Sequence, residues 1–336
     1  MKIIPGSRRR HYLARASIFL VTAALIAGLG GAYYVGGGNT PLSQNLEIRT
    51  WYDLDAVRDN LAGNHTLMND LDSTTSGYEE LASPTANQGK GWEPIGYSTP
   101  VASCGGAYTL LYGLSGTFDG QGHEIRDLFI NCPDEFAVGL LGYLDEGGII
   151  KNVGVVNVTV VGHNVVGSLV GYNNGGTVSN CYSTGNVTGH AAIGGLVGRN
   201  YAGNISNSYS TGSVSGESST GIGGLVGQQH PDCTISNSYS TCSVAGDLDI
   251  GSGDIGGLVG DNYFVENVIS SFWDTETSGQ STSDGGTGKN TTEMQDIATF
   301  SVAGWNIIEV ALNETNPAYI WNIVNNVTYP FLSWQS

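Results

Sequence analysis

The sequence predicts an all-β chain, a parallel β-helix (β-solenoid) with an N-terminal apolar helix and a small C-terminal capping region. Three observations support this fold class. A glycine-rich motif recurs along the chain, the apolar residues fall in short runs of strand length, and the 51 glycines show no collagen-like G-X-Y period. The last glycines of the motif copies are spaced by 29, 27, 29 and 33 residues, at Gly142, Gly171, Gly198, Gly227 and Gly260. Such a period is typical of solenoids.

The first element, residues 1–45, differs in kind from the rest of the chain. Four arginines up to Arg15 precede residues 18–35, which carry no charge. This pattern is typical either of a cleaved export signal, with small residues for cleavage at Gly30 to Ala32, or of a retained membrane anchor. Both alternatives place the body of the protein outside the cell or on its surface.

The net charge of the exported body limits the classes of partner that it can bind. Residues 1–35 hold five of the 12 basic residues and none of the 30 acidic ones, so the body carries a net charge of about −23. Nucleic acid binding requires lysine and arginine for the phosphates. The composition therefore predicts no nucleic acid partner and a soluble, self-repelling surface.

The repeated motif Gly-Gly-Leu-Val-Gly predicts a sharp corner or a close backbone contact in each coil. Glycine permits a sharp corner or the close approach of a neighbouring backbone. A phosphate-binding loop would need a following helix and a lysine, and the residues after the motif are not helical. We expect one leucine per copy to stack into a buried ridge, formed by Leu140, Leu169, Leu196, Leu225 and Leu258.

A second element, aliphatic-any-Asn, follows each motif by about ten residues. Residues i and i+2 of a strand share a face, so the asparagine is expected to be buried with the aliphatic residue. A buried amide needs hydrogen-bond partners, and coils about 4.8 Å apart let each asparagine bond to the next. The predicted ladder consists of Asn152, Asn180, Asn207, Asn237 and Asn267, extended upstream by Asp127.

Residues 46–336 resemble the proteins that carry the GLUG motif, on the repeats above and on segments such as Phe118–His123 and Ser271–Asp274. The resemblance implies a haemagglutinin-like surface β-helix in residues 46–273. Some members of that family carry a metallopeptidase domain, but here the one His-Glu pair, at His123, is followed by Asp127 where a zinc-binding histidine is required.

The C-terminal element, residues 274–336, does not contain the repeat. Asn290 followed by Glu293 predicts an N-capped helix that reaches about Phe300. The tryptophans at positions 305, 321 and 334 supply apolar area that would close an open solenoid end. A sugar-binding role for these tryptophans is the alternative.

Acidic residues raise the question of catalysis and of metal binding. Asp119, Glu124, Asp127, Asp134 and Glu135 form the densest group, and paired carboxylates can hydrolyse glycosides. Asp119 is, however, also expected in an Asp-Gly turn, and Asp127 is also expected in the ladder, so neither requires a catalytic role. The loop with Asp247, Asp249 and Asp254 is either a solvated loop or a weak calcium site; no other cofactor is expected.

One further group of residues remains open to two interpretations. Tyr182, Tyr209 and Tyr239 follow the ladder asparagines by two residues and predict a stacked row, with Gly154 and Ile269 at its ends. The row is either packed within the coil or exposed as a ligand platform.

Among the five cysteines, Cys104 and Cys132 flank the first coil and are the predicted disulfide.

The function predicted from these features is that of a non-enzymatic, exported cell-surface β-helix protein. It would act as an adhesin or a cell-envelope binding module whose partner is an envelope or host glycan or protein. If residues 18–35 are not cleaved, they would also anchor it in the membrane. A polysaccharide lyase or glycoside hydrolase and a passive envelope spacer are the alternatives.

Overall fold

The computed structural model describes residues 45–103, 106–217, 220–246 and 254–335. Residues 43–336 form one compact unit. The apolar segment 18–35 and almost all of the predicted leader 1–45 lie outside the described residues. Within the described ranges the longest α-helices have six residues, and none could cross a membrane.

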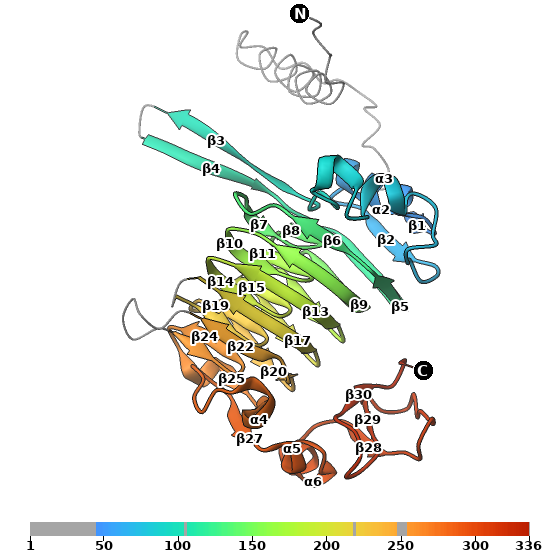
Figure 1. Ribbon diagram of the computed structural model, residues 1–336, viewed down its shortest axis with the longest axis vertical. Coiled ribbons are helices and arrows are strands. Elements are labelled where there is room, and N and C mark those ends of the chain that lie inside the picture. The colour runs from blue at the N-terminus through green and yellow to red at the C-terminus, as the bar shows by residue number, and fades with distance from the viewer. Residues whose placement is uncertain (1–44, 104–105, 218–219, 247–253, 336) are drawn as a thin grey trace, which may run out of the picture. The chain divides into compact units, whose positions relative to one another are not determined.

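The main body is a parallel β-solenoid, as predicted (Figure 1). One coil contains four strands, β12 (Thr177–Ser179), β13 (Tyr182–Gly189), β14 (Ala191–Gly194) and β15 (Val197–Tyr201). Equivalent strands of successive coils pair in parallel and in register, for example Val178 with Ile205. The two columns that contain β14 and β15 are five-stranded sheets.

The strands of the solenoid stack in four columns. The first column consists of β1 (Leu46–Ile48), β2 (Asn64–Leu67), β5 (Thr117–Arg126), β9 (Ile149–Val161), β12, β16 (Asn204–Ser206), β20 (Thr234–Ser236) and β25 (Val268–Ile269). The second column contains the distal half of β9, β6 (Phe129–Asn131), β13, β17 (Tyr209–Gly216), β21 (Tyr239–Ser240), β22 (Ser243–Gly246), β26 (Phe272–Asp274) and β27 (Thr287–Lys289). The third consists of β7 (Phe136–Val138), β10 (Asn164–Gly167), β14, β18 (Ile222–Gly223) and β23 (Ile255–Gly256). The fourth consists of β8 (Leu141–Leu144), β11 (Val170–Asn174), β15, β19 (Val226–Gln229) and β24 (Val259–Asn262).

The repeated glycines form the corner between the third and fourth columns. A Cβ atom on Gly194 would lie 2.1 Å from the carbonyl oxygen of Val197, and one on Gly195 would lie 2.2 Å from that of Gly224. Close backbone approach therefore excludes larger residues here. The five ridge leucines, Leu140, Leu169, Leu196, Leu225 and Leu258, are fully buried in the interior.

The predicted asparagine column forms a corner in left-handed conformation, and in the described residues one step of it carries the predicted hydrogen bond, from Asn180 Nδ2 to Asn152 Oδ1 at 3.1 Å. Asn152, Asn180, Asn207 and Asn237 have φ between 47° and 54° and are only partly buried, and Ser270 continues the column with φ 46°. Asparagine adopts this conformation more readily than most residues do. The reasoning from strand alternation failed because the left-handed residue turns the chain between the first and second columns, so positions i and i+2 do not share a face.

Two residues predicted for this column lie elsewhere. Asp127 is at a different corner, where its carboxylate accepts a hydrogen bond of 2.7 Å from the side chain of Asn157. Asn267 ends the 3-10 helix η4 (Val265–Asn267). Ile235 pairs with Val268, so the corner after β25 falls at Ser270.

A fully buried amide ladder does exist, but in the fourth column. Asn173, Asn200 and Gln229 have none of their surface exposed. Asn173 Nδ2 donates to Asn200 Oδ1 at 2.8 Å, and Asn200 Nδ2 donates to Gln229 Oε1 at 2.9 Å. The sequence carries a signal for it that was missed, since an Asn or Gln stands two residues after the last glycine in four of the five motif copies.

The N-terminal end, predicted as part of the β-helix, contains helical turns that cover the first coil. These are α2 (Trp51–Ala56), η1 (Val57–Asp59), α3 (Tyr78–Leu81) and η2 (Ala86–Gly89). Trp51 packs against Tyr78 and Trp92 with ring centroids 5.8 and 5.7 Å apart. An antiparallel hairpin of β3 (Tyr97–Ser103) and β4 (Gly106–Tyr112) then interrupts the coil, which the repeat pattern did not predict.

The C-terminal region has two parts. Residues 275–289, with α4 (Thr275–Ser278) and β27, close the last coil; Ser283 Oγ accepts hydrogen bonds from the backbone of Leu258 and Val259 at 3.2 and 2.9 Å. Residues 290–335, here called the C-terminal segment, contain α5 (Thr291–Met294), α6 (Ile297–Val302), β28 (Ile307–Glu309), β29 (Trp321–Ile323) and β30 (Phe331–Leu332).

The predicted helix start is confirmed, but the helix is divided. Asn290 caps α5, and Glu293 completes a reciprocal capping box. Asp296 then accepts a hydrogen bond from Ala298 N and caps a separate helix, α6. A second N-cap residue in the middle of the predicted helix therefore starts a new one.

The described cysteines are free thiols. Cys132, Cys181, Cys233 and Cys242 are all buried and unbridged. Cys104, the predicted disulfide partner of Cys132, lies outside the described ranges. A small apolar thiol is well suited to the interior of a coil.

Candidate functional site

The row of tyrosines lies on the outer face of the second column. Tyr182 and Tyr209 stack with ring centroids 4.9 Å apart, as do Tyr209 and Tyr239. Phe272, rather than the predicted Ile269, continues the row by pairing with Tyr239, and Gly154 stands opposite Tyr182 as expected. A Cβ atom on Gly154 would lie 2.4 Å from the Tyr182 ring, so glycine makes room for this ring.

The C-terminal segment covers this row from the side. Trp321 lies 6.1 Å from Tyr209 and 5.9 Å from Tyr239, and Trp334 lies 5.6 Å from Tyr182, measured between ring centroids. The row is consequently buried but outside the coil, where it forms a second apolar cluster with the segment. The predicted capping tryptophans thus cover a lateral face and do not close the solenoid end.

Polar contacts fix the segment on the row. Tyr239 donates a hydrogen bond of 2.6 Å to the carbonyl oxygen of Pro330, and Gln335 Nε2 donates to the Tyr209 hydroxyl at 2.7 Å. Tyr182 donates to the carboxylate of Glu124. Burial raises the pKa of Tyr182, with a further contribution from Glu124, and burial likewise raises the pKa of Tyr239.

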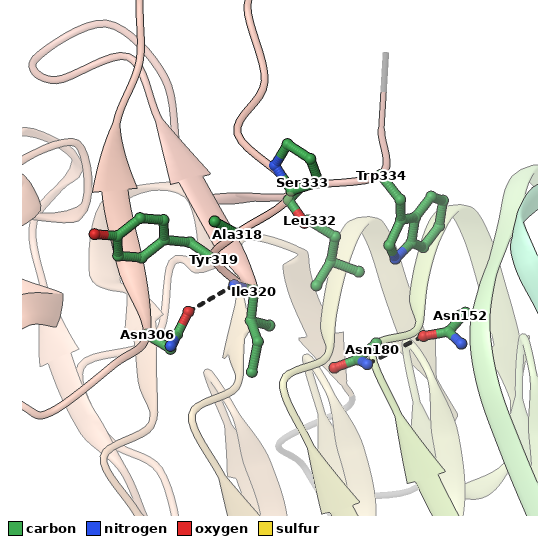
Figure 2. A pocket seen from close by; sticks show the side chains of 10 residues that line it. Asn152, Asn180, Asn306, Ala318, Tyr319, Ile320, Leu332, Ser333 and Trp334 are labelled. Atoms are coloured by element: carbon green, nitrogen blue, oxygen red, sulfur yellow. Dashed lines mark hydrogen bonds between the residues drawn. The ribbon is translucent and has the colours of Figure 1, made fainter.

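A pocket of about 290 Å³ opens where the segment meets the asparagine corner (Figure 2). The solenoid contributes Asn152 and Asn180, and the segment contributes Asn306, residues 317–320 and residues 332–334. None of these residues carries a formal charge. Leucine, isoleucine, proline and alanine side chains and the rings of Tyr319 and Trp334 alternate with the amides, so the lining is both apolar and polar.

Two residues of the pocket lining each carry a buried polar atom that has no partner within the described part of the chain. These atoms are Asn180 Oδ1 and Trp334 Nε1, an acceptor and a donor. The amide of Asn180 is oriented by its other end, because Nδ2 donates to Asn152 Oδ1 at 3.1 Å. Asn152 Nδ2 in turn donates to Asp119 Oδ1 at 3.1 Å. The column of amides therefore ends at Asn180 with an acceptor, and Figure 2 shows Trp334 beside the Asn152–Asn180 pair.

The acidic residues of the first coils are held in ion pairs and hydrogen bonds. Asp119 pairs with Lys151 at 3.1 Å, Glu124 with Arg126, and Glu135 with Lys90 at 2.8 Å. Burial alone would raise the pKa of Asp119, but hydrogen bonds from the Gln121 backbone, Asn152 and Lys151 hold it below its ordinary value. Asp119 thus joins neighbouring coils, whereas Glu124 pairs within its own strand and Glu135 pairs with the residue that follows η2.

The predicted calcium loop lies partly beyond the described ranges, which include Asp254 but neither Asp247 nor Asp249. Burial and the nearby carboxylate of Asp284 raise the pKa of Asp254. Among the described residues, no group of three or more His, Cys, Asp or Glu side chains is arranged to hold a metal ion.

Comparison with known proteins agrees with the repeat. Residues 162–188 and 189–215 match the model of the GLUG motif, so the chain carries GLUG repeats. It is 34% identical over 160 residues to halomucin of Haloquadratum walsbyi, and 32% identical over 184 residues to a candidate Gly-rich membrane protein of Evansella cellulosilytica. These matches cover 47% and 52% of this chain but only 2% and 19% of the two relatives.

A solved structure shows a similar fold. The crystal structure of a candidate immunoglobulin A1 protease from Bacteroides ovatus superposes with a TM-score of 0.52 over 90% of this chain and 96% of that one. The two sequences are 20% identical, so this likeness concerns the fold alone.

Proposed function

We propose that the chain is an exported, non-enzymatic cell-surface protein that acts as an adhesin or cell-envelope binding module. The observation that carries the proposal is the GLUG solenoid, in a chain that is similar in sequence to part of halomucin and to part of a candidate Gly-rich membrane protein. Export directed by residues 18–35, with or without cleavage, is part of the same proposal.

The fold is well suited to such a role. In parallel coils that stack in register, equivalent surface positions form a column. A ligand contact made by one coil can therefore be repeated by the next coil, about 4.8 Å away. The net charge of −18 for the whole chain keeps it soluble and disfavours nucleic acid. The acids of the first coils form ion pairs within the solenoid, which accounts for them without catalysis.

The test has two parts. Antibody labelling of intact cells that produce the protein, before and after permeabilisation, should detect it without permeabilisation. The purified full-length chain should bind isolated cell envelopes saturably and release no reducing sugar from them. Labelling only after permeabilisation would refute surface location, and sugar release would favour a polysaccharide-active enzyme. The absence of saturable binding would favour a passive spacer.

A further inference from the structure

We propose that the pocket between the asparagine corner and the C-terminal segment binds a neutral saccharide, holding one sugar ring between Asn180 and Trp334. This inference rests on the proposed function and deepens it, because it gives the binding module a site and a class of ligand. It concerns a pocket that the strand periodicity did not reveal.

The unpartnered atoms define the polar part of the ligand. A buried donor or acceptor without a partner costs about 1–3 kcal/mol, so such atoms in a pocket favour a ligand that satisfies them. Asn180 Oδ1 requires a donor and Trp334 Nε1 requires an acceptor. A hydroxyl group is both at once. Neighbouring hydroxyls on the same ring would then face the other polar side chains of the lining, Asn306 and Ser333.

The apolar walls define the rest of the ligand. Trp334 brings an aromatic ring to the pocket, Leu332 and Ile320 add aliphatic surface, and Tyr319 also contributes to the lining. A sugar ring combines a rim of hydroxyls with C–H faces that pack on such surfaces. The volume of about 290 Å³ lies just below the range of small-molecule sites, which is about 300–1,000 Å³. The pocket is therefore suited to a single ring rather than to a long stretch of chain.

Charge decides between neutral and acidic sugars. No arginine or lysine lines the pocket to pair with a carboxylate, sulfate or phosphate. The whole chain carries −18 and repels anions at long range. A neutral hexose or N-acetylhexosamine is thus favoured over a uronic acid.

Binding of free sugars to the purified full-length chain tests the proposal. D-glucose, D-galactose, D-mannose and N-acetyl-D-glucosamine would be titrated in parallel by saturation-transfer NMR, with D-glucuronic acid as the charged comparison. We expect at least one neutral sugar to bind with a Kd on the order of millimolar, as is typical of a ligand with few contacts.

Two variants each remove one of the two unpartnered atoms, and a third serves as control. Trp334→Phe keeps an aromatic ring but removes the indole N–H, and Asn180→Gly removes the acceptor while suiting the left-handed φ of 52°. Each should weaken binding about threefold to tenfold, the equivalent of one lost hydrogen bond. Asn207→Gly makes the same change one rung further, outside the pocket lining, and should bind like the wild type. Circular dichroism melting would show that all three are folded.

Several results would overturn the proposal: no neutral sugar binds, both variants bind like the wild type, the control weakens binding as much as they do, or glucuronate binds more tightly than every neutral sugar. Envelope binding by the same variants separates the two proposals. If the wild type and both variants bind envelopes equally while no free sugar binds, the saccharide site fails and the binding module stands. If sugars bind the wild type and not the variants, but envelopes do not bind at all, the site stands and the proposed function fails.

Discussion

Replacing Asn200 by leucine tests the buried amide ladder. Asn200 Nδ2 donates to Gln229 Oε1 and to the carbonyl oxygen of Gly203, and its Oδ1 accepts from Asn173 Nδ2, at 2.9, 3.1 and 2.8 Å. Leucine has a similar size but no polar atom. The change therefore removes three hydrogen bonds in the interior without leaving a large cavity.

The magnitude follows from which partners are left unpaired. Asn173 Nδ2 retains its bond to Gly176, and the Gly203 carbonyl still accepts from Thr234 N. Gln229 Oε1 loses its amide donor, while Gln229 Nε2 already has no partner in the described part of the chain. One unsatisfied buried acceptor costs about 1–3 kcal/mol and each lost hydrogen bond about 0.5–1.5 kcal/mol. We expect Asn200→Leu to destabilise the protein by about 2–6 kcal/mol, from one unsatisfied acceptor and two further lost hydrogen bonds.

Thermal and urea unfolding of the full-length chain would measure this loss. At roughly 2–4 °C per kcal/mol for a domain of 150–250 residues, the melting temperature should fall by several degrees. Asn207→Gly is the matched control, because Asn207 is partly exposed and its φ of 48° suits glycine; it should cost less than about 1 kcal/mol. If Asn200→Leu melted with the wild type, or no lower than Asn207→Gly, the ladder would contribute no net stability and the reasoning would be refuted.

The further predictions concern the corner, the coils, and the buried tyrosines and thiols. Asn207→Val should cost about 1–3 kcal/mol more than Asn207→Gly, because a β-branched residue is strained at positive φ; equal unfolding midpoints would contradict a conformational role for this asparagine. Deleting one rung, residues 198–226, should detach the C-terminal segment, since Trp334 and Trp321 contact different rungs; tryptophan fluorescence should shift to the red, and an unchanged spectrum would show that the segment adjusts to a shorter solenoid. Burial raises the pKa of Tyr239 and, to about 12, that of Tyr329, so the folded state holds these protons more tightly than the unfolded state does. Their contribution to stability should be complete below about pH 10, the ordinary pKa of tyrosine, and be lost as pH rises further, and urea midpoints from pH 7 to 11 would test this. Burial also raises the pKa of buried thiols, to about 11 for Cys242, so their contribution to stability should begin to be lost from about pH 8.5, the ordinary pKa of a thiol. An unfolding midpoint that stays constant to pH 11 would count against tight burial of both the tyrosines and the thiols.

The sequence by itself determined the solenoid. In a coil whose repeats stack, the neighbour of each residue is its equivalent in the next repeat, so the period is also a record of contacts. This is why the leucine ridge, the glycine corner and the stack of Tyr182, Tyr209 and Tyr239 could be predicted from spacing alone. Periodicity also placed the four central asparagines in one column, although it did not show that the column is a corner.

The tertiary structure decided where side chains point and what covers them. A left-handed residue such as Asn207 ends the alternation of side chains along the strand, so Asn207 does not share the buried face of the aliphatic residue two positions before it. The fully buried amide is at Asn200, in another column, which only the structure shows. The C-terminal segment has no repeat, and its contacts join residues far apart in the sequence, such as Gln335 and Tyr209, which are 126 residues apart. No local pattern encodes contacts of that length, because they depend on where the chain returns after the coils have stacked. The pocket at Asn180 and Trp334 exists only because of that return.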